Sequence, residues 1–227
     1  MIYTKVFTLP PFNEAEIRRY AGIGRETLDA QSVEDCLSQC MNETKDIFQG
    51  TVCYVTVPIR VCGDEVDLQF AKVKSKALAK NLSGCEKAVV FAATAGIQID
   101  RLIVKYQKKS ISKALFMQAI GAERVESLCD VFCDWLKEEG EKQKNYLRPR
   151  FSPGYGDLPL EFQKDMVKVL DCTKKIGVSL NESLLMTPSK SVTAIVGMGK
   201  LPCEENKLPG KGCDSCSKRD CDYRKVK

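Results

Sequence analysis

Histidine is absent from all 227 residues of this sequence. Its absence excludes histidine metal ligands, histidine acid–base catalysis and any Ser–His or Cys–His nucleophile pair within the chain. A metal site that needs an imidazole ligand would therefore have to take it from another chain.

Long hydrophobic runs are also missing. No segment approaches the roughly 20 apolar residues that a membrane span requires. The segment Met1–Pro10 is too polar and too short for a signal peptide. We therefore expect no membrane partner and a cytoplasmic protein.

Basic and glycine-rich patterns that bind nucleic acids or phosphates are missing as well. The net charge is +5, but residues 200–227 hold eight Lys or Arg against five Asp or Glu, so the rest is nearly neutral. We expect no nucleic-acid partner. Neither G-x-G-x-x-G nor G-K-[ST] occurs, so Gly96, which follows an apolar run, is predicted to form only a tight strand-to-helix turn.

The composition is that of a globular protein, with 44% hydrophobic and 29% charged residues. Patterning predicts strands and helices in alternation. The predicted strands are 1–9, 51–57, 87–94 and 191–196, and the predicted helices are 14–20 capped by Asn13, a second one capped by Ser32, 69–82, 98–108, 110–143 in two pieces broken near Gly121, and one from about 160 to 176. We expect residues 1–200 to form one α/β domain with a mixed or antiparallel sheet flanked by helices, followed by a short cysteine-rich tail.

Twelve cysteines are present, although nothing predicts secretion. In a reducing compartment such a number indicates a metal or cluster site rather than a disulfide framework. Four of them recur on apolar helix faces and are predicted to be core residues, since free cysteine packs like a small hydrophobe. These are Cys36, Cys40, Cys129 and Cys133.

The tail, residues 201–227, has a different character. It contains Cys203, Cys213, Cys216 and Cys221, spaced Cys-x9-Cys-x2-Cys-x4-Cys, and almost no core-forming residues. A metal would supply the missing order, and four thiolates suit zinc or an iron–sulfur cluster. The alternative is a tail of reduced thiols that binds no metal.

The stretch 148–199 carries the most informative pattern. Arg150 precedes a Pro153–Gly154 corner and Tyr155. Arginine pairs with carboxylates through two parallel hydrogen bonds, glycine permits close backbone approach, and tyrosine adds a flat apolar face. The combination suits a small carboxylate-bearing ligand. On the residues alone, a surface turn with a solvated arginine is the simpler explanation.

Two motifs in this stretch resemble those of a known family. The first is Arg-x-x-x-Gly-Tyr, and the second, after a helix, is Glu-Ser-x-x-Met-x-Pro-x-x-Ser-Val. The matching residues are Arg150, Gly154, Tyr155, Glu182, Ser183, Met186, Pro188, Ser191 and Val192. The stretch resembles the activation domain of cobalamin-dependent (vitamin B12-dependent) methionine synthase, and residues 85–140 resemble it more loosely.

The resemblance implies binding of S-adenosylmethionine. The arginine of the family grips the carboxylate of the ligand, which assigns that role to Arg150, with Gly154 and Tyr155 in the same pocket. A helical glutamate of the family also contacts the ligand. Its counterpart here is Asp130, with Glu126, one turn away, as the second candidate.

In the family, one electron and the methyl group of S-adenosylmethionine reactivate oxidised cobalamin to methylcobalamin. The resemblance therefore implies an accessory component of methionine synthase, a methyltransferase, rather than a complete enzyme. We expect it to act on a separate cobalamin-bearing methionine synthase or corrinoid protein, with an electron donor such as flavodoxin or ferredoxin. An iron–sulfur cluster in the tail would feed the electron. The alternative function is a non-catalytic binding module, stabilised by a metal in its tail, that senses redox state or metal.

Overall fold

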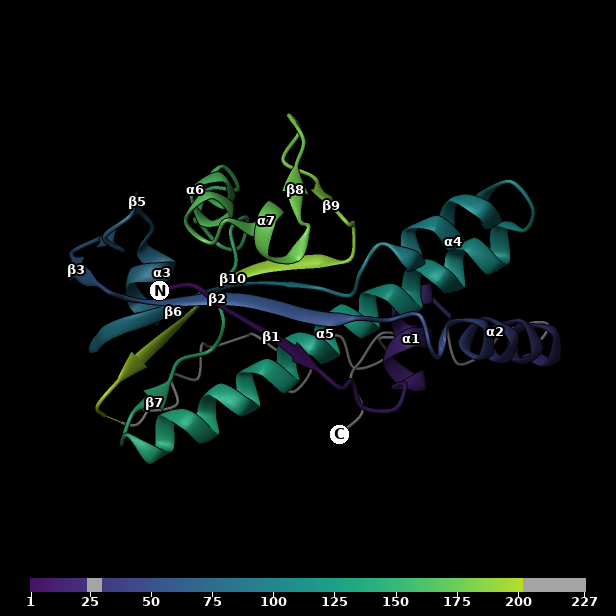
Figure 1. The fold of residues 1–227 in the computed structure, drawn as a ribbon, viewed down its shortest axis with the longest axis horizontal. Coiled ribbons are helices and arrows are strands. Elements are labelled where there is room, and N and C mark those ends of the chain that lie inside the picture. Colours follow the sequence, from purple (N-terminus) through teal and green to yellow (C-terminus); the bar gives the residue numbers. More distant parts are fainter. Residues whose placement is uncertain (24–29, 202–227) are drawn as a thin grey trace, which may run out of the picture.

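The computed structural model describes residues 1–23 and 30–201, which contain a five-stranded sheet in the order β1-β2-β6-β10-β7 (Figure 1). Every pairing in this sheet is antiparallel. The strands are β1 (Tyr3–Phe7), β2 (Gly50–Pro58), β6 (Cys85–Thr94), β10 (Ser191–Gly199) and β7 (Tyr146–Leu147). The predicted α/β domain with an antiparallel sheet is confirmed.

Helices cover both faces of the sheet (Figure 1). The helices are α1 (Glu14–Ala21), α2 (Ala30–Thr44), α3 (Lys76–Asn81), α4 (Gln98–Gln107), α5 (Ile111–Lys142), α6 (Phe162–Val169) and α7 (Cys172–Ile176). The remaining short strands are β3 (Arg60–Cys62), β4 (Glu65–Asp67), β5 (Lys72–Lys74), β8 (Ser179–Leu180) and β9 (Met186–Thr187).

The long helix α5 packs diagonally across one face of the sheet (Figure 1). Alternate residues of the central strands, such as Phe91 of β6 and Val196 of β10, pack there against Leu128 and Phe132 of α5. The two-residue period of a strand sends neighbouring side chains to opposite faces, so the apolar run of β6 from Ala88 onward is buried on both sides, as its sequence predicts.

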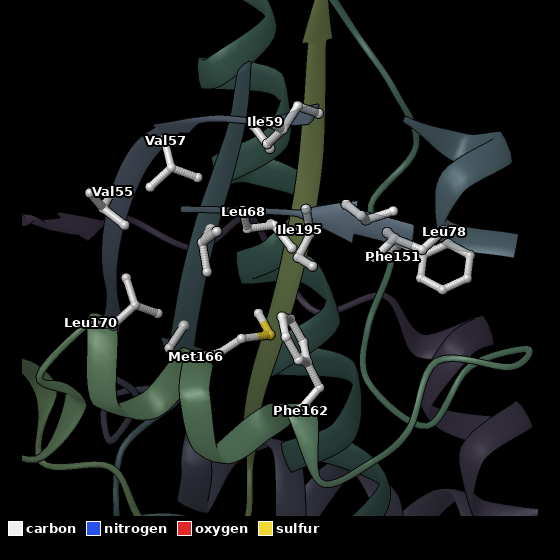
Figure 2. Packing of buried hydrophobic residues seen from close by; sticks show 14 of the residues in the cluster. Val55, Val57, Ile59, Leu68, Leu78, Phe151, Phe162, Met166, Leu170 and Ile195 are labelled. Atoms are coloured by element: carbon white, nitrogen blue, oxygen red, sulfur yellow. The ribbon is translucent and has the colours of Figure 1, made fainter. Parts of the chain in front are cut away.

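The opposite face is covered by α3, α6 and α7. Figure 2 shows Met166 of α6 and Leu170, which follows this helix, directed toward Val55 of β2 and Ile195 of β10. The ring of Phe151 lies in this layer beside Leu78, and Phe151 is only 6% exposed. This core therefore reaches the edge of the sheet just where the Arg-x-x-x-Gly-Tyr motif runs.

Helices α1, α2 and α4 form a third layer around the N-terminal half of α5. Asn13 caps α1 by accepting a hydrogen bond from the backbone of Glu16, as predicted. Cys40 of α2 is fully buried in this layer. Cysteine packing is confirmed on α5 as well, where Cys129 is fully buried and Cys133 partly so.

Two local predictions are wrong. The segment predicted as helix 69–82 contains strand β5, and only Lys76–Asn81 is helical. The predicted break near Gly121 does not exist, because α5 is continuous. An added Cβ at Gly121 would lie 2.9 Å from Lys190 Cγ, so this glycine serves close packing rather than a break.

Two further helix boundaries also differ from the prediction. The chain is already helical at Ala30, so Ser32 lies inside α2 rather than at its cap. The helix predicted from about 160 to 176 is divided into α6 and α7 at Asp171, which adopts a left-handed backbone conformation with a φ of 48°.

Candidate functional site

The motif segment runs along the edge of the sheet beside β10. The backbone N–H of Arg148 donates to Gly197 O (2.8 Å), and Phe151 and Ile195 exchange two backbone hydrogen bonds of 2.9 and 2.8 Å. Neighbouring side chains of an extended segment point to opposite faces. Phe151 accordingly enters the core under α3 and α6, whereas Arg150 reaches the face that α5 covers.

The turn that follows explains the glycine of the motif. The backbone N–H of Tyr155 donates to Ser152 O (3.1 Å), and Gly154 has a φ of 83°. These values describe a type II turn, which takes proline at its second position and requires a positive φ at its third. Tyr155 is 48% exposed, and its ring meets the ring of Phe151 edge-on at 5.3 Å.

The guanidinium of Arg150 is held between two carboxylates of α5. Its Nη2 lies 2.5 Å from Glu126 Oε2, and its Nη1 lies 2.7 Å from Asp130 Oδ1. The side chain of Arg150 is 28% exposed, so it does not extend into bulk water. The fold therefore brings together the predicted arginine and both acidic candidates. Asp130 and Glu126 precede Arg150 in the sequence by 20 and 24 positions.

The surroundings of this cluster keep Arg150 charged and the neighbouring thiols neutral. Partial burial works against the charge of Arg150, but the neighbouring groups, with the two carboxylates among them, raise its pKa on balance. Burial raises the pKa of Cys129 and of Cys133, so both remain neutral thiols beside the guanidinium. The cluster thus has one fixed positive charge and two negative charges.

Asp157 is a residue that the sequence prediction missed. Its carboxylate accepts hydrogen bonds from Ser75 Oγ (2.5 Å), Lys76 N (2.8 Å) and Ala77 N (3.1 Å) at the start of α3. These bonds lower the pKa of Asp157, and that from Ser75 contributes most. Asp157 therefore fastens the motif turn to α3. Its partners lie about 80 positions away, so no local pattern could have revealed it.

The second motif builds the start of β10. Ser191 Oγ lies 2.9 Å from Thr94 Oγ1 and donates to Pro188 O (2.8 Å). Asp100 of α4 accepts hydrogen bonds from the backbone and the hydroxyl of Ser189 (2.7 and 2.6 Å). The contacts of these residues join β10 to β6 and α4, so they have a structural role.

A surface cavity of about 490 Å³ lies elsewhere, around α3 and the β3–β4 turn. It is lined by Val61, Gly63, Asp64, Lys76, Ala79, Lys80 and Ser83. None of these is a residue that the sequence assigned to ligand binding, and the chemistry of the Arg150 cluster makes that cluster the stronger candidate.

Within residues 1–23 and 30–201, no group of three or more Cys, Asp or Glu side chains is arranged to hold a metal ion. The predicted metal ligands Cys203, Cys213, Cys216 and Cys221 lie outside the described residues. No helix in the described part of the chain is long and apolar enough to cross a membrane.

Comparison with solved structures identifies the fold as that of a reactivation domain. A crystal structure described as the MetH reactivation domain bound to AdoHcy superposes with a TM-score of 0.64 at 13% identity, covering 87% of this chain and 78% of the other. Residues 75–200 match the family described as vitamin B12 dependent methionine synthase, activation domain. The chain belongs to this family. A comparison with curated proteins finds no match.

Proposed function

We propose that this protein binds S-adenosylmethionine at the Arg150 cluster and supports the reductive methylation of cob(II)alamin on a separate protein. The observation that supports this most strongly is the pairing of Arg150 with Glu126 and Asp130 beside the type II turn of the motif. The amino-acid end of S-adenosylmethionine carries one carboxylate and one ammonium. A cluster of one guanidinium and two carboxylates is complementary to both groups.

The residues divide the work of binding. Arg150 would hold the ligand carboxylate through charge-assisted hydrogen bonds, and Asp130 or Glu126 would accept from the ammonium. Gly154 keeps the turn in its type II form, and Tyr155 offers a partly exposed ring for the remaining apolar surface. Bound S-adenosylmethionine would supply the methyl group. The task of these side chains is to orient it, since positioning is the contribution that the protein makes when cofactors carry the chemistry.

The cobalamin would belong to the partner. The sequence contains no histidine that could ligate cobalt. We therefore propose a cobalamin-bearing methionine synthase or corrinoid protein as the partner, with flavodoxin or ferredoxin as the electron donor. In this assignment the chain is an accessory component of the methyl transfer rather than the complete enzyme.

Titration calorimetry with S-adenosylmethionine tests the ligand site. Replacing Arg150 with alanine removes a charge-assisted pair worth about 1.5–3 kcal/mol, so we expect binding about tenfold to a hundredfold weaker. The matched control is Arg148→Ala on the same segment, because among the described residues the side chain of Arg148 makes only long hydrogen bonds, of 3.4 Å, to the carbonyls of Ser83 and Leu201. Equal affinity of the wild type and the Arg150 variant would contradict the site.

A reactivation assay tests the rest of the function. Cob(II)alamin-bearing methionine synthase, S-adenosylmethionine and a one-electron reductant are combined with and without this protein. We expect methylcobalamin to form only with the protein. Binding without reactivation would favour the non-catalytic module instead.

We further propose that residues 201–227 form a separate metal-binding tail, with Cys203, Cys213, Cys216 and Cys221 as ligands. Their spacing and the thiolate preference of zinc and iron support this. Metal analysis of anaerobically purified protein is the test. Iron with a cluster absorption spectrum supports electron delivery, stoichiometric zinc supports a structural clip, and the absence of both metals contradicts the proposal.

A further inference from the structure

Each terminal nitrogen of the Arg150 guanidinium already donates to a carboxylate of α5. Nη1 contacts Asp130 and Nη2 contacts Glu126, at 2.7 and 2.5 Å. The two acids lie one helical turn apart on α5, so their carboxylates meet the same end of the guanidinium. Each terminal nitrogen keeps a second N–H, but a ligand carboxylate that approaches this end meets two carboxylates of like charge, so taking the place of one of them avoids that repulsion.

Breaking the ion pair between Arg150 and Asp130 costs less free energy than breaking the pair between Arg150 and Glu126. Its side chain is 69% exposed, whereas that of Glu126 is 42% exposed. An exposed ion pair contributes little because water replaces it readily. Glu126 also borders α1, where its charge adds to the effect of burial in raising the pKa of Tyr20. Glu126 is therefore the lasting partner of Arg150, and Asp130 is the exchangeable one.

We infer that Asp130 is a specificity-determining residue that selects zwitterionic ligands by moving from Arg150 to the ligand ammonium when the ligand carboxylate takes its place on Nη1. This inference rests on the proposed function. A zwitterion brings one charge of each sign, so every charge in the cluster keeps an opposite partner. A ligand with a carboxylate and no ammonium would leave Asp130 unpaired, and three negative charges would surround one guanidinium. Such a ligand is penalised by repulsion between like charges and by the lost ion pair.

The test compares three ligands that share the adenosine part. S-adenosylhomocysteine carries both charged groups, its deaminated analogue S-(5′-deoxyadenosyl)-4-thiobutanoate carries only the carboxylate, and 5′-methylthioadenosine carries neither. Dissociation constants are measured by calorimetry for the wild type and for Asp130→Asn, which keeps the size of the side chain and removes its charge. The matched control is Asp134→Asn, one turn further along α5 and also exposed.

The expected result is a change in opposite directions. In Asp130→Asn, S-adenosylhomocysteine should bind about tenfold more weakly, because its ammonium loses a charge-assisted partner. The deaminated analogue should bind several-fold more tightly, since its competitor for Arg150 has been removed. Methylthioadenosine should bind both proteins equally, and Asp134→Asn should behave like the wild type.

Other outcomes separate this inference from the proposed function. In one outcome, S-adenosylhomocysteine binds the wild type and binds Arg150→Ala more weakly, but Asp130→Asn changes the affinities of the two carboxylate-bearing ligands in the same direction or changes neither. The exchange is then refuted and the ligand site stands. If the wild type binds no S-adenosylhomocysteine, both are refuted.

Discussion

Replacing Glu123 with alanine is expected to destabilise the protein strongly. Glu123 is 2% exposed, and its carboxylate accepts from Arg124 Nε and Nη2 (both 2.5 Å), Asn13 N (3.2 Å) and Ser127 Oγ (2.7 Å). Among the described residues, the substitution would leave the buried guanidinium of Arg124 with the carbonyls of Pro10 and Pro11 and the ring of Phe12, and with no carboxylate in contact. Removing one partner of a buried ion pair costs about 3–5 kcal/mol, because the other charge stays buried without compensation.

Urea unfolding measures this loss. Trp135 is the single tryptophan, and its ring packs against Phe7, Tyr54 and Phe132, so its fluorescence reports on the core beneath α5. The free energy of unfolding should fall by about 3–5 kcal/mol with an unchanged m-value. The control is Glu138→Ala, an exposed acid on the same helix, for which a change within about 0.5 kcal/mol is expected. A loss of about 1 kcal/mol or less for the Glu123 variant, as for an exposed pair, would refute the reasoning.

Three further substitutions or treatments have defined outcomes. An added Cβ at Gly197 would lie 2.7 Å from the nearest side chain, so Gly197→Ala should lose about 1–3 kcal/mol of unfolding free energy, and an unchanged urea midpoint would contradict this. The pKa of Asp157 is lowered by its hydrogen bonds, so its carboxylate stabilises the fold above its unfolded pKa of about 4, and this contribution disappears as the pH falls through the folded value. The urea midpoints of the wild type and Asp157→Ala should therefore differ at neutral pH and converge in acid, whereas a constant difference would refute this role. The thiols of Cys53 and Cys172 are fully buried 3.9 Å apart, so iodoacetamide should modify exposed Cys62 in the native protein and reach this pair only in denaturant, as peptide masses will show.

Four of the five strands of the sheet were predictable because their signals are local, whereas β7, with two residues, was not predicted. The central strands contain apolar runs with several β-branched residues, and such runs predict buried strands without reference to the rest of the chain. The region 60–74 was not predictable in this way, since β3, β4 and β5 have three residues each. Val61, Val66 and Val73 align across these strands, and that register is visible only in three dimensions. A tertiary contact likewise decides Gly121, where Lys190 approaches α5.

The candidate site was predictable in part. The spacing of Glu126 and Asp130 places both on one side of a helix. The Pro-Gly pair of the motif indicates a type II turn, in which Gly154 takes a positive φ. Nothing local joins Arg150 to that helix; the resemblance to the family supplied this link. The exchangeable character of Asp130 depends on distances and exposed fractions, which no sequence pattern contains.

A crystal structure of this protein with S-adenosylhomocysteine tests the central claim most directly. We predict that the ligand carboxylate lies within hydrogen-bond distance of Arg150 Nη1, with Asp130 turned toward the ammonium and Glu126 still on Nη2. Ligand density at another place, with Arg150 still paired to both Glu126 and Asp130, would contradict the account.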